Sequence, residues 1–327
     1  MEYHKKRYGN NSKNMRKIKI AFIGAGNMTT EHIKCFYDEK NVELTGIFSR
    51  TRIRSESLSK LFNIKYVCDS VEELYNKTKA DLVIVCVPIL MNKIICFEVF
   101  KYPWMSLIEK PVGYNYSEAK EILLEQKKQE ANSFVALNRR HYNSTTVAYN
   151  DFENIDGVRI VQIQDQEDLL LAQKANHPKL VLKNWMYANS IHLIDYLSVF
   201  CRGEVISVDN TIPWSNKLFY VLSKIQYSSG DIGIYQCIWN GPGPWSVSIS
   251  SLERRYEIRP LEKGFFQEKN SRIINEIDVS EWDKNYKPGL RMQAYQAIKA
   301  VRKKQHNLPS LEEGLKTMKL IKNIYEI

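Results

Sequence analysis

The sequence predicts an α/β protein with a doubly wound parallel sheet in its N-terminal part and a largely antiparallel sheet with helices in its C-terminal part. Short β-branched runs alternate with helical runs from residue 17 to about residue 138, which is typical of a parallel sheet. A glycine pair, Gly24-x-Gly26, stands between the first of these runs and a helix. After residue 138, strand-like segments follow one another closely and are separated by turn residues, as in antiparallel sheets.

The length of 327 residues indicates two domains, because a single core rarely grows beyond about 250–300 residues. We divide the chain into a basic tail at residues 1–16, a first domain at residues 17–138 and a second domain at residues 139–327. Apolar residues make up 44% and charged residues 26%, which is typical of a soluble globular protein.

Targeting signals and metal motifs are not found in the sequence. The longest apolar run, Leu82–Met91, is much shorter than the ~20 residues of a membrane-spanning helix. The N-terminus has no apolar segment of the kind found in signal peptides. The six cysteines form no CxxC pair and no metal-ligand spacing, which favours reduced thiols and no metal. We therefore expect a cytoplasmic protein that does not bind a membrane.

The formal net charge of +10 raises nucleic acid as a partner. Six basic residues and one acidic residue lie within residues 1–17, so half of the net charge belongs to a polar tail that we expect to be disordered. No recognition helix, zinc pattern or RNP-like aromatic strand accompanies it. We therefore expect a small-molecule ligand and no nucleic acid.

The expected strands of the first domain include continuous apolar runs, which suit strands buried on both faces of a parallel sheet. A capping box, Ser70-x-x-Glu73, predicts a helix just before one of these runs, and another helix is expected at Tyr116–Glu130. The expected strands are Lys17–Ile23, Val42–Phe48, Asp81–Val87, Leu107–Ile108 and Ser133–Leu137.

The second domain is expected to contain an antiparallel sheet with one solvated face and one face packed on helices. Its helices are expected at Trp185–Phe200, Arg291–Lys304 and Leu311–Tyr325. The expected strands are Val205–Ile212, Leu218–Gln226, Ile232–Trp239, Trp245–Ser251 and Arg255–Pro260.

The glycine pair predicts a dinucleotide site of the Rossmann type. Gly24 allows a tight turn, and Gly26 lets the backbone approach a pyrophosphate. The helix that begins near Asn27 and Met28 directs its free N–H groups at that phosphate. Thr29 stands where the full fingerprint has a third glycine, a position that serves helix–strand packing. A plain glycine turn is the alternative.

The end of the second strand indicates which nicotinamide cofactor is bound. An NAD site usually has Asp or Glu about 20 residues after the glycines, where it binds the ribose 2′-hydroxyl. Ser49, Arg50 and Thr51 stand here instead. A hydroxyl and a guanidinium suit a 2′-phosphate, so we predict NADP, with NAD as the alternative.

Several motifs together resemble one family. The stretch SLIEKPVG ends a strand in Glu109-Lys110-Pro111 after a GxG domain. It is similar to a motif of the glucose–fructose oxidoreductase, inositol dehydrogenase and MocA family. Further similar stretches are spread over nearly the whole chain after the tail; they are Val85–Asn92, Ala136–Asn143, Ile191–Leu197 and Leu311–Ile321.

The resemblance implies a Rossmann domain followed by a substrate-binding and oligomerisation domain with an open, largely antiparallel sheet. It also implies a nicotinamide cofactor, a sugar-type substrate and a homo-oligomer, either a dimer or a tetramer. The cofactor is expected to contact Val87, Pro88, Asn92 and Glu109. Lys110 matches the family's catalytic lysine, which exchanges the proton of the reacting oxygen, and burial would lower its pKa toward neutral.

His192 matches a family histidine that reaches the substrate oxygen together with Lys110. The family has an aspartate four residues before it, one helical turn away, but this chain has Ala188 there. Tyr187, as a proton donor, and Asn189, as a substrate ligand, are the nearest polar residues that could replace it. A core histidine bonded to the backbone is the alternative role for His192.

Further substrate contacts are expected from two places. Arg139 and Arg140 follow the last parallel strand, and either could face the cofactor or an anionic substrate. We assign Arg140 to the substrate and expect one of the two to lie on the surface. Trp185 leads into the His192 helix and is assigned to the sugar pocket.

The function that these residues favour is hydride transfer between NADP and a sugar hydroxyl or ketone, with Lys110 as general acid–base. The substrate could be a free sugar, a sugar phosphate or a nucleotide-linked sugar. One alternative is a glycosidase or lyase that oxidises its sugar transiently and retains its cofactor. Another is a non-catalytic cofactor-binding regulator, which the missing aspartate would fit and Lys110 would not.

Overall fold

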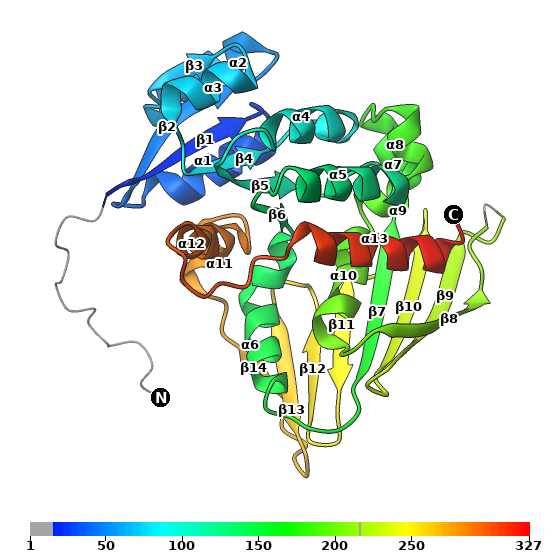
Figure 1. Ribbon diagram of the computed structural model, residues 1–327. Helices are drawn as coiled ribbons and strands as arrows, with labels where there is room; N and C mark the ends of the chain where they lie inside the picture. The colour runs from blue at the N-terminus through cyan, green and yellow to red at the C-terminus, as the bar shows by residue number, and fades with distance from the viewer. Residues whose placement is uncertain (1–15, 216) are drawn as a thin grey trace, which may run out of the picture.

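The computed structural model describes residues 16–215 and 217–327, which form two sheets and their covering helices (Figure 1). The first sheet is parallel, with strand order β3-β2-β1-β4-β5-β6. The order reverses between β1 and β4, and the crevice at their carboxyl ends is where such sheets bind ligands. The predicted doubly wound parallel sheet is confirmed.

The elements of the first domain alternate strictly between strand and helix until β6. They are β1 (Ile18–Ile23), α1 (Asn27–Tyr37), β2 (Val42–Phe48), α2 (Arg52–Phe62), β3 (Tyr66–Cys68), α3 (Val71–Thr78), β4 (Leu82–Val85), η1 (Ile89–Met91), α4 (Asn92–Val99), β5 (Met105–Glu109), α5 (Tyr116–Lys128) and β6 (Ser133–Ala136). β4 and β5 are buried along their whole length, because helices cover both faces of the sheet.

The second sheet has the strand order β14-β13-β12-β11-β7-β10-β9-β8. All its neighbours are antiparallel except the central pair β7 and β10. The predicted largely antiparallel sheet is therefore confirmed. The elements are η2 (Asn138–His141), α6 (Asn143–Phe152), β7 (Ile160–Glu167), α7 (Leu169–Lys174), α8 (Lys179–Lys183), α9 (Trp185–Ala188), α10 (Ile191–Phe200), β8 (Val205–Ile212), β9 (Tyr220–Tyr227), β10 (Ile232–Trp239), β11 (Ser246–Ser250), β12 (Arg254–Ile258), β13 (Gly264–Glu268), β14 (Asn275–Ile277), α11 (Glu281–Asn285), α12 (Leu290–Val301) and α13 (Leu311–Tyr325).

Helices α6, α10 and α13 lie over one face of the second sheet (Figure 1). Side chains alternate along the strands, so that Val161 and Ile163 of β7 are buried under these helices while Gln162 between them is accessible to solvent. α10 is apolar on nearly all sides because it lies between the sheet and α13.

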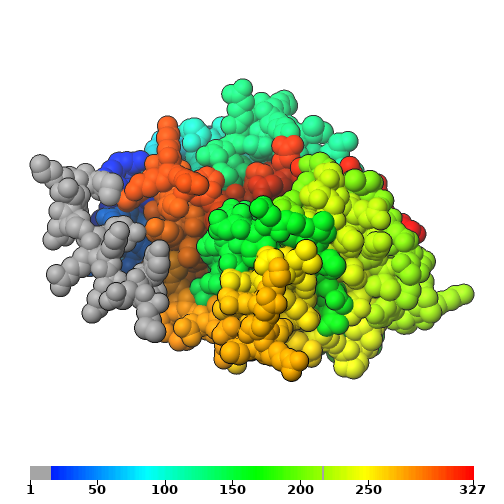
Figure 2. Space-filling model, turned by 90° about the horizontal axis from the view of Figure 1, so that it is seen from below, coloured from blue at the N-terminus to red at the C-terminus, as the bar shows by residue number. Residues whose placement is uncertain are grey.

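The last helices connect the two domains. α12 packs on α1, where its Leu290, Ala294 and Ala297 share a core with Ile33 and Phe36. Figure 2 shows α11 and α12, in orange, between the blue first domain and the green and yellow second domain. The two domains are therefore held together by a buried apolar contact as well as by the chain crossover at η2.

The predicted tail lies outside the described residues except for Arg16, which pairs with Asp81 at 2.5 Å. Within residues 16–215 and 217–327, none of the helices has the length and hydrophobicity that crossing a bilayer requires.

Candidate active site

The glycine loop connects β1 to α1 at the reversal of strand order. Gly24 has a φ of +109°, and a Cβ atom there would lie 2.0 Å from the carbonyl oxygen of Cys86. Only glycine fits, because the loop lies directly on the end of β4. A Cβ atom at Gly26 would meet nothing within 4 Å, so the space beside this residue is open to a ligand.

The beginning of α1 fits an anion. Asn27 is its first residue, and no side chain caps the helix, so its first N–H groups have no capping acceptor. The positive end of the helix dipole adds to the attraction of a phosphate. The residues present thus fit the pyrophosphate of a dinucleotide.

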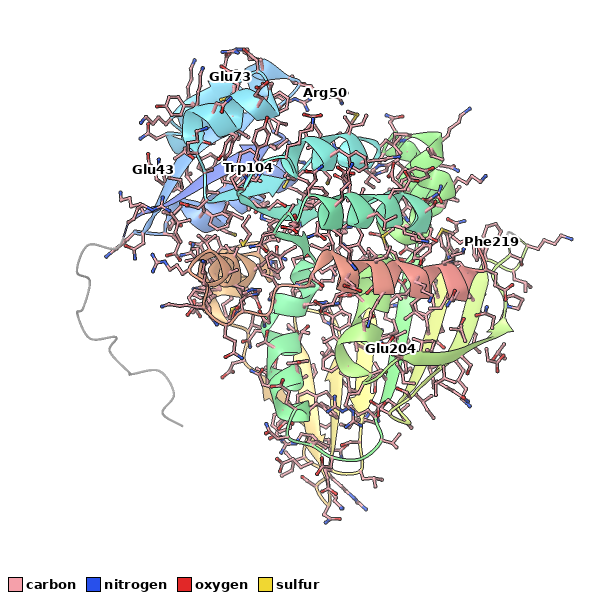
Figure 3. The ribbon with its side chains drawn as sticks, in the orientation of Figure 1. Glu43, Arg50, Glu73, Trp104, Glu204 and Phe219 are labelled. Atoms are coloured by element: carbon pink, nitrogen blue, oxygen red, sulfur yellow. The ribbon has the colours of Figure 1, made fainter. Side chains whose placement is uncertain are left out.

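A first cavity, here called pocket A, has a volume of about 280 Å³ and extends from the glycine loop toward α2. It contains most residues that the sequence assigns to the cofactor, namely Gly24, Gly26, Ser49, Arg50, Thr51, Val87 and Pro88. Figure 3 labels Arg50 at the edge of the first domain, where β2 leads into α2.

Two arginines of pocket A have no acidic partner. Arg50 and Arg54 both line the cavity, and neither has a carboxylate within 4.0 Å in the described part of the chain. Arg52 between them points elsewhere and pairs with Glu56 and Asp69. The open guanidinium groups of Arg50 and Arg54 suit a phosphate on the adenosine side of a dinucleotide.

A second cavity, pocket B, also has a volume of about 280 Å³ and lies between the two domains. It shares Gly26, Cys86 and Val87 with pocket A, so the two cavities meet at the glycine loop. Its other polar residues come from five separate segments; they are Thr29, Glu109, Lys110, Asn138, Arg139, Tyr142, His192 and Lys287.

Lys110 follows β5 directly and is the partly buried base of pocket B. Its Nζ atom donates a hydrogen bond to the carbonyl oxygen of Ala188 at 2.9 Å. Burial and, secondarily, the charge of Arg139 lower the pKa of Lys110 to about 8. An amine with this pKa can both accept and release a proton near neutral pH.

Glu109 lies just before Lys110 but bonds to another residue. Its Oε1 lies 2.7 Å from Nε2 of His32, which is buried on α1. Among the described residues, His32, Cys86 and Glu109 form the one group of potential metal ligands within 4.8 Å of one another. His32 and Glu109 bond directly to each other, and burial raises the pKa of the Cys86 thiol, which disfavours the thiolate that would bind a metal.

His192 lies on α10 and lines pocket B. Its side chain is buried, and its Nδ1 has no hydrogen-bond partner in the described residues. Burial, together with the charges of Arg139 and Lys110, lowers the pKa of His192 well below its usual range. The imidazole is therefore neutral at physiological pH, and it has a free nitrogen.

The helix expected at Trp185–Phe200 is interrupted. α9 ends at Ala188 and α10 begins at Ile191, so Ala188 and His192 are not one turn apart on a continuous helix. The prediction of one helix was wrong at this point. The interruption frees the carbonyl of Ala188, which accepts the hydrogen bond of Lys110.

Glu167, which the sequence did not indicate, holds this interruption in place. It is fully buried at the end of β7 and accepts hydrogen bonds from Trp185 at 2.7 Å, Asn189 at 2.9 Å and Ser190 at 2.9 Å. Burial and the neighbouring carboxylate of Asp165 raise the pKa of Glu167. Trp185 and Asn189, assigned to the substrate from sequence, thus bind Glu167 and do not line pocket B.

Three other assigned residues lie outside both pockets. Tyr187 is buried, and its hydroxyl interacts with the backbone of Tyr116 in α5. Asn92 is also buried and donates to the carbonyl of Pro111 at 2.7 Å, behind Lys110. Asn27 is exposed at the first turn of α1.

Arg140 also lies away from pocket B. Its guanidinium binds both carboxylate oxygens of Asp195 at 2.8 Å and Glu313 at 3.0 Å. The neighbouring Arg139 lines pocket B instead. Arg140 borders another, larger cavity of about 870 Å³ between β8 and α13, which shares no lining residue with pockets A and B.

Comparison with known proteins agrees with this arrangement. Residues 18–137 match the model of the oxidoreductase family with an NAD-binding Rossmann fold, which is the GFO/IDH/MocA family. The first domain belongs to this family. The resemblance seen in the sequence motifs is confirmed, and with it the assignment of the chain to the oxidoreductases.

Solved structures extend the likeness in fold to nearly the whole chain. A candidate NADPH-dependent oxidoreductase from Desulfitobacterium hafniense has a TM-score of 0.80 at 15% identity, with 96% of each chain covered. A dehydrogenase from Chromobacterium violaceum has a TM-score of 0.80 at 16% identity, covering 96% of this chain and 95% of the other. The UDP-N-acetylglucosamine 3-dehydrogenase of Acidithiobacillus ferrooxidans has a TM-score of 0.74 at 13% identity, covering 94% and 96%. No curated protein sequence matches the chain.

Proposed function

We propose that this GFO/IDH/MocA protein is an NADP-dependent oxidoreductase that transfers a hydride between nicotinamide and a hydroxyl or ketone of a sugar-type small molecule. The observation that carries the proposal is the position of Lys110. A partly buried amine with a lowered pKa lines the cavity that meets the glycine loop, where the nicotinamide end of a dinucleotide would lie.

The chemistry divides between cofactor and protein. A bound nicotinamide supplies the hydride acceptor or donor. In the oxidation direction, neutral Lys110 accepts the proton of the substrate hydroxyl while the carbon loses its hydride. In the reduction direction, protonated Lys110 returns that proton to the developing alkoxide. Ala188 holds Nζ by one hydrogen bond, which orients the remaining N–H or lone-pair positions.

His192 assists this proton transfer in the proposal. Its neutral imidazole can bond to the reacting oxygen or to a neighbouring hydroxyl, since Nδ1 has no partner among the described residues. A buried polar nitrogen without a partner is costly, and a substrate hydroxyl would satisfy it. Lys110 and His192 would thus contact the substrate from opposite domains.

NADP is proposed over NAD because of the charges in pocket A. Arg50 and Arg54 line it without acidic partners, and no Asp or Glu lines the same cavity. An acidic side chain there would bind a ribose 2′-hydroxyl, whereas guanidinium groups favour a 2′-phosphate. The fold neighbour from Desulfitobacterium hafniense is also described as NADPH-dependent.

A sugar-type substrate is proposed from the polar lining of pocket B and from the family. The fold neighbour from Acidithiobacillus ferrooxidans is a UDP-N-acetylglucosamine 3-dehydrogenase, which acts on a nucleotide-linked sugar. We also propose that the protein is a homo-oligomer, a dimer or a tetramer, because none of the helices that the structure describes covers the other face of its second sheet.

The test is a substrate screen with the purified full chain. Free sugars, sugar phosphates and nucleotide-linked sugars are mixed with NADP⁺, and the matching ketones with NADPH, while the absorbance of reduced nicotinamide is followed. We expect a lasting absorbance change with at least one compound. Product formation without any lasting change would instead identify an enzyme that oxidises its sugar transiently and retains its cofactor.

A further inference from the structure

The side chains around pocket B carry an excess of positive charge. Three cationic residues, Lys110, Arg139 and Lys287, line this cavity, and Glu109 is the one acidic residue among those that line it. Glu109 is already bonded to His32. The cavity therefore has a net positive potential before any ligand enters.

Arg139 has donors that the protein does not use. Its guanidinium lies over the ring of Trp245, 4.7 Å from the centroid, which fixes its plane. Its Nε is buried and has no hydrogen-bond partner, and no carboxylate lies within 4.0 Å of the group in the part of the chain that the structure describes. By contrast, Arg140 next to it is fully occupied by Asp195 and Glu313.

Lys287 completes the pair from another segment. It precedes α12, and its Nζ lies 3.1 Å from the sulfur of Met28, a weak acceptor. No described carboxylate pairs with it, although Lys284 three residues earlier pairs with Glu281 at 2.8 Å. Arg139 and Lys287 thus both come from the segments that join the two domains.

Other carboxylates do not neutralise these groups. Asp165 and Glu167 of β7 lie on the side of the second domain, but each is bonded to other donors. Burial raises the pKa of both, which reduces their negative charge near neutral pH. Burial is the main cause of the lowered pKa of Lys110, and the charges of Arg139 and Lys287 lower it further, whereas Glu109 and Glu167 raise it.

We infer that Arg139 and Lys287 bind an anionic group on the substrate, a carboxylate or a phosphate, beside the carbon that Lys110 serves. The planar fork of Arg139 suits paired oxygens, and Lys287 adds a point charge. The inference rests on the proposed function and narrows its substrate class to acidic sugars or sugar phosphates. The phosphates of the cofactor already have α1 and the arginines of pocket A, whereas Arg139 lies beside His192 and Trp245.

The experiment measures binding by calorimetry to the full chain saturated with NADP⁺. Matched probes differ in one group: glucose, glucuronate, which replaces the terminal CH₂OH by a carboxylate, and glucose 6-phosphate. The same comparison uses myo-inositol and its monophosphate. We expect an acidic probe to bind at least about tenfold more tightly than its neutral partner. The glucuronate and phosphate arms decide which anion the pair prefers.

Variants assign the effect to the two cations. Arg139→Gln and Lys287→Met are each expected to weaken binding of the acidic probe about tenfold. Each should change binding of the neutral probe only slightly. Arg139→Lys keeps the charge without the fork and should lose less. Lys284→Met, a surface lysine of the same segment, is the matched control and should change nothing. Thermal melting confirms that each variant is folded.

Several outcomes overturn the inference. Equal or tighter binding of the neutral probes would do so, as would the absence of binding by every acidic probe. If Arg139→Gln and Lys287→Met weakened NADPH binding as much as they weaken binding of the acidic probe, both cations would be assigned to the cofactor. If hydride were transferred with neutral substrates alone, the proposed function would stand and this inference would fail. If the protein bound anions selectively without any hydride transfer, this inference would stand and the proposed function would fail.

Discussion

At the scale of single residues, the proposed acid–base role of Lys110 predicts that the rate of the reaction depends on pH. Oxidation needs the neutral amine, so its rate should rise as pH increases through about 8 and then level off. Reduction needs the ammonium, so its rate should fall over the same range. Steady-state kcat/KM in both directions, measured across this range, tests the prediction. Parallel profiles in the two directions would show that Lys110 is not the acid–base group.

At the same scale, the NADP proposal predicts that Arg50 determines which nicotinamide cofactor binds more tightly. Arg50→Ala removes a guanidinium of pocket A and should weaken NADPH binding by about 1.5–3 kcal/mol, the scale of a charge-assisted hydrogen bond. NADH binding should be nearly unchanged. Arg52→Ala is the control, because Arg52 pairs with Glu56 and Asp69 outside the pocket. Tighter binding of NADH than NADPH by the unmodified protein would contradict the NADP proposal.

Where a motif fixes the backbone, the sequence predicted the positions of its residues in the fold. Gly24, Gly26 and Lys110 lie where their motifs indicated, because each follows directly from the end of a buried parallel strand. The sequence led us to assign Arg140 to the substrate, whereas Arg139 is the arginine that lines pocket B. Their side chains point in different directions, and the carboxylates of Asp195 and Glu313 that occupy Arg140 are far away in the sequence.

At the scale of elements, Glu167 of β7 fixes the interruption between α9 and α10. Its folded pKa is raised above the ordinary carboxyl value of 4.5. The unfolded chain therefore ionises first as pH rises, so this group lowers stability progressively from the ordinary carboxyl range up to its folded pKa. Glu167→Gln cannot ionise, and its free energy of unfolding should depend less on pH over this range. Urea unfolding of both proteins at several pH values checks the prediction.

Glu167→Gln also allows a second measurement, whose result would stay unchanged if the role of Glu167 were purely structural. If Glu167 positions the Ala188 carbonyl for Lys110, Glu167→Gln should also shift the pH profile of oxidation. An unchanged kinetic profile with changed stability would limit Glu167 to a structural role.

The strand β7 shows why part of the second domain escaped sequence analysis. Its sequence IVQIQDQE alternates, but glutamines occupy the outer face and two acids occupy the inner face near its end. The apolar alternation is therefore short, although β7 is the central strand of the sheet. The interruption after Ala188 was missed for a related reason, since hydrogen bonds to Glu167, distant in sequence, stabilise it.

At the scale of the whole molecule, α12 ties the second domain to the first. Leu290 is fully buried against α1, so Leu290→Ala should lower the free energy of unfolding by about 2–5 kcal/mol, as for other large-to-small core changes. Because pocket B takes residues from both domains, binding of the acidic probes should weaken as well. Chemical denaturation measures the first effect. A loss below about 0.5 kcal/mol would show that the contact with α1 is not a core contact.

The overall architecture was accessible from sequence, because alternating strands and helices leave few arrangements for a parallel sheet. The packing of α12 against the first domain could not be predicted from the sequence. Its apolar stripe predicts a buried face but does not indicate which domain covers it.

The central claim is that Lys110 transfers the proton that accompanies hydride transfer. The most direct test compares Lys110→Met with the unmodified protein, using a substrate from the screen and measuring turnover and NADPH affinity separately. We predict that turnover falls by at least about two orders of magnitude while NADPH affinity stays nearly unchanged, because Lys110 does not line pocket A. Near-normal turnover of Lys110→Met would contradict it.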